Sequence, residues 1–266
     1  MSSGRPSVTA RWVAAHRARL APTRPSTPDG DVAAEAALDR DVRGVFAVPL
    51  GWPTGMPERT RFVDGEVARA LGHGVDQIVL VGAGYDGRAL RFGGGATRWF
   101  EVDFPSTQAD KRRRLAALGV ARADVAYAGV DLLTGDLDRA LDAAGHDAAR
   151  PSLFVCEGLF TSLTLEAVVA VCRALRERAS TGSVLVATFL VAPGDGSRGP
   201  ALHAVVDQLL ALVGERRRSE FFEGDPEKLM VVTGWRVARS ASPPPGRRAA
   251  GRHLLALAAE PTPGER

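Results

Sequence analysis

The sequence predicts an α/β fold with a mostly parallel seven-stranded sheet, an antiparallel C-terminal hairpin and a helical N-terminal cap. Three observations lead to this prediction. Short β-branched and apolar runs alternate with helical segments through the middle of the chain, which is typical of parallel strands joined by crossover helices. Two later strand-like runs are separated by a proline-rich loop instead of a helix. The first 57 residues have helical spacing and no strand-like run.

The N-terminal cap is expected over residues 1–57. Apolar residues recur at helical spacing in Val8–Leu20 and in Asp31–Gly44. A turn-rich connector with three prolines, Ala21–Gly30, separates these helices. A second stretch rich in proline and glycine then ends the cap before the alternating region begins.

The alternating region covers residues 58–190 and is expected to form the core of the sheet. Its expected strands are Gln77–Val81, Arg98–Asp103, Val125–Val130, Ser152–Cys156 and Ser183–Leu190, and its expected helices are Thr60–Leu71, Ser106–Leu118, Asp136–Ala144 and Leu165–Arg178.

The C-terminal part, residues 191–266, is expected to supply a lid and to close the sheet. A proline- and glycine-rich break at Pro193–Pro200 precedes a helix near Ala201–Val213 and a charged loop. Strand-like runs at Trp235–Arg239 and His253–Glu260 then form the antiparallel hairpin. No repeat and no second core are visible, so the 266 residues are expected to form one domain.

The charge balance argues against a nucleic-acid partner. Of the 34 basic residues 32 are arginine, and the sequence pI is about 9.3. The net charge is nevertheless only +3, because aspartate and glutamate are interleaved with the arginines. A phosphate-binding surface would concentrate basic residues on one face.

Cysteine content and hydropathy limit the other classes. Cys156 and Cys172 fit neither a disulfide framework nor a zinc ligand set, so we expect reduced thiols, no metal and a cytoplasmic location. The longest apolar run, Val184–Ala192, is far shorter than the roughly 20 residues that span a bilayer, so no membrane partner is expected. The sequence does not predict the oligomeric state.

Unusual residues follow four of the expected parallel strands. Ligands of open parallel sheets bind at the carboxyl ends of the strands, so these residues are candidates for a site. After the first strand, Gly82 allows a tight turn and Gly84 lets a ligand approach the backbone. Asp103 ends the second strand, about twenty residues on, where a carboxylate suits ribose hydroxyls. Asp131 and Glu157 follow the third and fourth strands.

Each carboxylate has a plainer alternative, as a solvated loop residue or a helix cap. That alternative is weakest for Glu157, which directly follows the apolar run Leu153–Cys156. Because side chains alternate along a strand, we expect only one of Glu101 and Asp103 to point into the site. Asp103 is chosen because it is nearer the end of the strand.

The glycine turn fits two kinds of nucleotide cofactor. Residues 82–87 match the pattern G-x-G-x-x-G of dinucleotide-binding proteins. A dinucleotide would bring a pyrophosphate to the following helix N-terminus, where Asp86 would repel it. S-adenosylmethionine brings a zwitterionic amino acid instead, whose carboxylate Arg88 or Arg59 can hold. The residues therefore favour the methyl donor over a nicotinamide cofactor.

Several segments together resemble the leucine carboxyl methyltransferase family, whose members are class I S-adenosylmethionine-dependent enzymes. The segments that carry the resemblance are Val81–Phe92, Trp99–Pro105 with Gln108, Lys111 and Leu115, Cys156–Leu159, Arg59–Asp64, and Thr9-Ala10 with Arg17-Ala18. The resemblance covers about residues 9–190 well and the tail through Gly234-Trp235 loosely. It implies a Rossmann-like class I methyltransferase fold.

The resemblance also implies roles for individual residues. Gly82 and Gly84 would pass along the methionine moiety, with Arg59, and also Arg17 from the cap, near its carboxylate. The remaining implied contacts are the ribose for Asp103, the adenine side for Asp131 and Leu132, and the methionine amine for Glu157. The product would be S-adenosylhomocysteine.

The sequence departs from the family pattern at Ser162, where members usually carry tyrosine. An altered acceptor site or a loss of activity is therefore implied. His203 is the one candidate base near the expected lid, and a surface helix histidine is its alternative. An ionised carboxylate acceptor needs no base, whereas a phenol or alcohol does. We therefore expect O-methylation of a small molecule, with a carboxylate slightly favoured.

Two other functions stay open on the sequence. One is an NAD(P)-dependent oxidoreductase, supported by the glycine pattern. The other is a scaffold that binds S-adenosylmethionine without transferring its methyl group, suggested by Ser162. The expected setting for the leading hypothesis is specialised metabolism.

Overall fold

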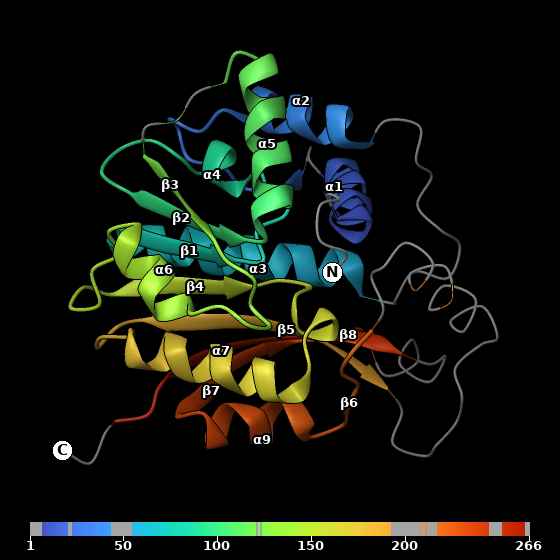
Figure 1. Cartoon of the computed structure of the whole chain (residues 1–266), viewed down its shortest axis with the longest axis vertical. Helices are drawn as coiled ribbons and strands as arrows, with labels where there is room; N and C mark the ends of the chain where they lie inside the picture. Colours follow the sequence, from blue (N-terminus) through green and yellow to red (C-terminus); the bar gives the residue numbers. More distant parts are fainter. Residues whose placement is uncertain are drawn as a thin grey trace.

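A β-sheet of eight strands runs through the middle of the computed structural model (Figure 1). The structure describes residues 7–20, 23–43, 55–120, 122, 124–192, 208, 211, 217–244 and 252–263. Seven strands follow the order β3-β2-β1-β4-β5-β8-β7, and β6 pairs with β5 off this path. The strand bounds are β1 Gln77–Val81, β2 Arg98–Asp103, β3 Val125–Gly129, β4 Ser152–Cys156, β5 Val184–Ala192, β6 Phe221–Phe222, β7 Trp235–Ala241 and β8 His253–Pro261.

This topology confirms the predicted fold class. Strands β1 to β5 pair with one another in parallel, whereas β8 is antiparallel to both β5 and β7. The two-residue β6 was not predicted. The order of the parallel strands reverses between β1 and β4, so their carboxyl ends form a crevice at that point.

The helices cover both faces of the sheet and extend beyond one edge (Figure 1). Their bounds are α1 Val8–Leu20, α2 Val32–Arg43, α3 Met56–Gly72, α4 Arg88–Arg91, α5 Pro105–Ala117, α6 Leu137–Ala143, α7 Leu165–Glu177 and α9 Asp225–Val232, with a 3-10 turn, η2, at Phe160–Ser162. One apolar core joins α6, α7 and α9 to the sheet, and a second joins α3 and α4 to the opposite face.

The predicted cap contains α1 and α2, which pack on each other, and α2 also packs on α4. Their apolar side chains, among them Ala14 and Leu38, form a third buried cluster with Tyr85 and Leu90 of the core. The cap is therefore attached next to the loop that follows β1.

The structure corrects the prediction for the C-terminal part in one place. Part of the expected charged loop is the helix α9, which begins after Gly224 in a left-handed conformation (φ 84°) and has Pro226 in its first turn. Leu229 and Met230 anchor this helix in the core. The expected lid at 193–200 and His203 lie outside the described residues, as does nearly all of the helix expected near 201–213.

None of the helices that the structure describes combines the length and the apolar character needed to cross a bilayer.

Candidate functional site

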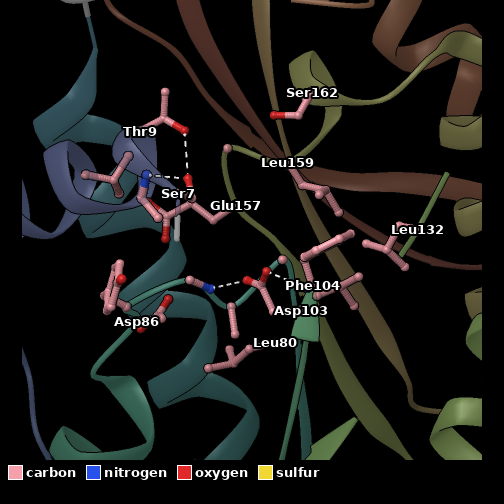
Figure 2. A pocket seen from close by; sticks show the side chains of 18 of the residues that line it. Ser7, Thr9, Leu80, Asp86, Asp103, Phe104, Leu132, Glu157, Leu159 and Ser162 are labelled. Carbon is pink, nitrogen blue, oxygen red and sulfur yellow. Dashed lines mark hydrogen bonds between the residues drawn. The ribbon is translucent and has the colours of Figure 1, made fainter. Parts of the chain in front are cut away.

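A cleft opens at the carboxyl edge of the sheet, where the strand order reverses. One wall is the cap helix α1, with Ala10, Val13 and Arg17 facing the cleft. The opposite wall is the loop that follows β4. Figure 2 shows Asp103 between these walls, with Asp86 on one side of it and Leu132 on the other.

The glycine turn after β1 forms the floor of the cleft. Gly82 and Gly84 adopt positive φ values of 70° and 50°, which other residues rarely adopt. A Cβ atom on Gly82 would lie 2.9 Å from Leu159, and one on Gly84 would lie 2.9 Å from Ala10. Glycine is therefore needed at both positions for conformation, and at Gly84 also for space, because the Ala10 Cβ cannot move away as the end of the Leu159 side chain can.

Asp103 is tied to this turn by its side chain. Its carboxylate accepts hydrogen bonds from the backbone N–H of Gly84 (2.5 Å) and of Phe104 (2.6 Å) (Figure 2). These bonds orient the Asp103 carboxylate, which also lines the cleft and would offer acceptor oxygens to the hydroxyl groups of a ligand.

Glu101 takes a different role from Asp103, although the two side chains lie on the same face of β2. Residues two apart on a strand lie on the same face, so the expectation based on alternation was wrong. The two side chains differ instead in how far along β2 they lie. Glu101 is buried and bonds to Lys111 Nζ at 2.7 Å. Burial raises the pKa of the Glu101 carboxyl, and Lys111 opposes that shift.

The end of the cleft beside Leu132 is more apolar than the end beside Arg17. Leu132, Leu133 and Phe104 line it together with Asp131. Asp131 Oδ1 accepts a hydrogen bond from the backbone N–H of Leu133 at 3.0 Å. Asp131 therefore has the plainer role expected for it, as a cap within its loop, and it also faces the cleft.

Glu157 lies at the other end of the cleft, within reach of three guanidinium groups. Its carboxylate is 2.5 Å from Arg88, 2.8 Å from Arg59 and 3.7 Å from Arg17. The loop that carries it is held by a bond from Gly158 N–H to the Thr188 hydroxyl (2.8 Å). Of these three arginines, Arg17 lines the cleft. Arg59 and Arg88 contact Glu157 but do not line the cleft.

The arginines keep the acids of this end ionised. Burial by itself would raise the pKa of the Glu157 carboxyl, but Arg88, Arg59 and Arg17 hold it well below its usual range. The pKa of Asp86 is lowered as well, because Arg17 and Arg88 outweigh its burial. The methionine end of a cofactor would therefore meet fixed charges of both signs.

Asp86 also decides between the two cofactor classes. Its Oδ1 accepts the backbone N–H of Arg88 at 2.9 Å, at the start of α4. A dinucleotide places its pyrophosphate on such N–H groups. Here a carboxylate already occupies that position, and α4 has only four residues, so the geometry does not support a nicotinamide cofactor.

The structure brings most of the predicted site residues to this one cleft. Those that line it are Gly82, Gly84, Asp103, Asp131, Leu132, Glu157, Arg17 and Ser162. Sequence reasoning missed several cap and loop residues that also line it, namely Ser7, Thr9, Val13, Phe104, Leu159 and Leu163. A helical pattern alone does not reveal which face of α1 meets the core.

Comparison with known proteins shows the family. The model of the leucine carboxyl methyltransferase family matches residues 27–176, which is more than half of the 266 residues. The chain belongs to the leucine carboxyl methyltransferase family. The cofactor is S-adenosyl-L-methionine.

Two curated relatives carry the name "Putative S-adenosyl-L-methionine-dependent methyltransferase". The one from Streptomyces coelicolor is 36% identical over 182 residues, and the alignment covers 68% of this chain and 58% of that protein. The one from Rhodococcus jostii is 34% identical over 219 residues, covering 78% of this chain and 74% of that protein. The chain thus spans less than two thirds of the Streptomyces coelicolor protein.

A solved structure supports the fold. The crystal structure of "a putative methyltransferase from Thermobifida fusca YX" superposes with a TM-score of 0.55 at 16% identity, covering 98% of this chain and 97% of that chain. At this identity the likeness concerns the fold alone.

The residues of the cleft fit S-adenosylmethionine. The glycine turn presents backbone without side chains to the cleft, Asp103 stands at the end of β2, and the apolar end suits a purine. At the polar end, the buried Arg17 has a guanidinium Nε without a hydrogen-bond partner. A cofactor carboxylate would find a cation there.

Proposed function

We propose that this chain transfers the methyl group of S-adenosylmethionine to an oxygen atom of a small molecule, with a carboxylate favoured over a phenol or alcohol. The preference for a carboxylate acceptor rests on one observation, which is that none of the acidic residues in the described part of the cleft is without a bonding partner. Those that line its described part already bind arginines or backbone N–H groups, and no His, Lys or Cys lines it there. Tyr85 lines it too, but its hydroxyl donates to Asp110.

The engagement of each acid is specific. Glu157 and Asp86 are bound to arginines, and Asp103 and Asp131 accept backbone N–H groups. A hydroxyl acceptor needs a base within hydrogen-bond reach, whereas an ionised carboxylate needs none. A carboxylate acceptor therefore suits the described residues better.

The cofactor supplies an electrophilic methyl group on a sulfonium. The chain then contributes mainly orientation, which is a large source of rate acceleration when two reactants must be aligned. We assign Asp103 to the ribose, Asp131 and Leu132 to the adenine side, and Arg17 to the methionine carboxylate. Arg59 and Arg88 act through Glu157, which they hold in place.

Ser162 is the residue we assign to the acceptor. It lies in η2 on the cleft wall, and its backbone N–H bonds to the Leu159 carbonyl (2.9 Å). The walls formed by α1 and by the loop after β4 enclose a concave site, which favours a small acceptor over a protein surface. A role in specialised metabolism and a cytoplasmic location stay predictions, and so does the division into one domain with cap, core and lid.

Methyl-labelled S-adenosylmethionine tests this proposal with a panel of carboxylic acids, phenols and alcohols. We expect S-adenosylhomocysteine to form together with a labelled ester, whose label is released by mild base. A base-stable labelled ether would contradict the carboxylate preference. S-adenosylhomocysteine binding without transfer to any acceptor would identify a cofactor-binding scaffold instead.

A further inference from the structure

Asp64 is a carboxylate of α3 that holds two arginines behind the cofactor cleft. Its side chain is completely buried and does not line the cleft. Asp64 Oδ1 accepts a hydrogen bond from Arg88 Nε at 2.7 Å, and Asp64 Oδ2 accepts one from Arg24 Nε at 2.6 Å. Asp64 therefore joins α4 of the core to the connector between the two cap helices.

The guanidinium of Arg88 reaches from Asp64 to both acids at the methionine end of the cleft. Its Nη1 lies 2.5 Å from Asp86 Oδ2 and 2.5 Å from Glu157 Oε2. Its Nη2 is buried and has no hydrogen-bond partner among the described residues, so it adds nothing to the orientation of the group. Because a guanidinium is rigid and planar, the bond from Nε to Asp64 fixes the direction in which Nη1 points.

Arg24 in turn orients Asp64. Arg24 Nη2 donates a second bond to the carboxylate, to Oδ1 at 3.2 Å, so one guanidinium binds both oxygens of Asp64. Two-point contacts of this kind fix geometry as well as charge. Arg24 Nη1 also donates to Glu35 of α2 at 2.9 Å. A chain of contacts thus runs from the cap through Arg24, Asp64 and Arg88 to Glu157.

We propose that Asp64 is a positioning residue for the methionine end of the cofactor, acting through Arg88 on Glu157. The proposal rests on the proposed function, with Glu157 next to the methionine amine as the family resemblance implies. Glu157 lines the cleft and would offer an acceptor oxygen to that amine. The two charges of the zwitterion are then met separately, the amine by Glu157 and the carboxylate by Arg17. Without the charge of Asp64, Arg88 can turn and Glu157 loses its fixed position.

This role predicts a loss of affinity that is selective for the amino-acid part of the ligand. S-adenosylhomocysteine carries that part, whereas 5′-methylthioadenosine keeps the adenosine and the sulfur without it. In Asp64→Asn, the Kd for S-adenosylhomocysteine should rise about 3- to 30-fold, as expected for a residue that acts on a ligand through another side chain. The Kd for 5′-methylthioadenosine should stay within about twofold of wild type. A general loss of stability would instead weaken both ligands alike.

Titration calorimetry with both ligands measures these constants. Glu66→Gln is the matched control, because Glu66 is a buried carboxylate of the same helix that Arg239 binds at both oxygens, at 2.9 and 2.8 Å, and it does not line the cleft. The control should also lose stability, but it should bind both ligands as wild type does. An unchanged ratio of the two Kd values in a folded Asp64→Asn variant would overturn the proposal.

A double-mutant cycle with Glu157→Gln tests whether Asp64 acts through Glu157. Once Glu157 has lost its charge, adding Asp64→Asn should cause little further loss of affinity for S-adenosylhomocysteine, because coupled residues are not additive. Equal losses in the wild-type and Glu157→Gln backgrounds would show that Asp64 acts independently of Glu157, which would overturn the proposal.

Arg24→Gln tests the same chain of contacts from the cap if Asp64→Asn does not fold. It leaves Asp64 bound to Arg88 and Glu35 bound to Arg91, so neither buried carboxylate loses its last arginine. The affinity for S-adenosylhomocysteine should again fall more than that for 5′-methylthioadenosine, and an unchanged ratio would overturn the proposal. No binding of S-adenosylhomocysteine by wild type would overturn the proposed function as well, whereas an unchanged ratio in the variants overturns this inference alone.

Discussion

Replacing Asp103 by asparagine should weaken cofactor binding without unfolding the protein. The Asp103 carboxylate ends β2 and accepts N–H groups of Gly84 and Phe104 at 2.5 and 2.6 Å. Asparagine keeps the volume and one acceptor oxygen, so one of these bonds can persist. It loses the charge and replaces the other oxygen by a donor that faces an N–H group.

The expected loss can be worked out from these contacts. Hydrogen bonds to a charged group contribute about 1.5–3 kcal/mol, against about 0.5–1.5 kcal/mol for neutral ones. Removing the charge should therefore cost about 1–1.5 kcal/mol for each ribose hydroxyl that Asp103 accepts, or about 2–3 kcal/mol for both. The Kd for S-adenosylhomocysteine should then rise about 30- to 150-fold.

Titration calorimetry with S-adenosylhomocysteine measures this change. Asp76→Asn is the matched control, because Asp76 precedes β1 at the opposite edge of the sheet and pairs with Arg150. The control should bind as wild type does. An unchanged Kd in a folded Asp103→Asn variant would refute the assignment of Asp103 to the ribose.

Three further predictions follow from the structure. Gly84→Ala should destabilise the fold by about 1–2 kcal/mol, because the φ of Gly84 is +50°. It should also weaken cofactor binding, because the new Cβ would lie 2.9 Å from Ala10 and displace this part of the cleft wall. Gly119→Ala, with φ +71° and open space around it, should lose only stability, and equal cofactor binding by both variants would contradict the role assigned to the glycine turn. Burial lowers the pKa of His146 from its ordinary value of about 6.5 to about 4 in the folded state. The stability that neutral His146 contributes is therefore complete above pH 6.5 and is lost as the pH falls toward 4, by about 2–3 kcal/mol. Urea unfolding of His146→Gln should lack this part of the pH dependence on the acid side, and an unchanged dependence would contradict the prediction. Ser162→Tyr should raise the KM for the acceptor at least tenfold with little change in S-adenosylhomocysteine affinity, and the opposite pattern would move Ser162 to the cofactor side.

Much of the fold could be predicted because buried parallel strands have a strong sequence signal. The apolar runs of β1, β2 and β4 have the predicted bounds residue for residue. The helix α9 was missed, since eight residues rich in charge resemble a loop until their apolar side is known to be buried. A sequence signal did exist in Gly224-Asp225-Pro226, which is typical of a helix start.

The site could be predicted only where the topology fixes it. Parallel strands bring their carboxyl ends to one edge, so Asp103, Asp131 and Glu157 were found from their positions. The ion pairs of Glu157 with the arginines could not be found in this way, because they join distant segments. Arg88 and Glu157, for example, are 69 residues apart, and no local pattern in the sequence indicates that pair.

The identity of the nucleotide that the cleft binds is the most direct test of the cofactor assignment. Titration calorimetry of the full chain with S-adenosylhomocysteine and with NAD decides this in one experiment. We predict one molecule of S-adenosylhomocysteine bound per chain and no binding of NAD, since Asp86 occupies the N–H group at the start of α4. Binding of NAD without binding of S-adenosylhomocysteine would contradict the account.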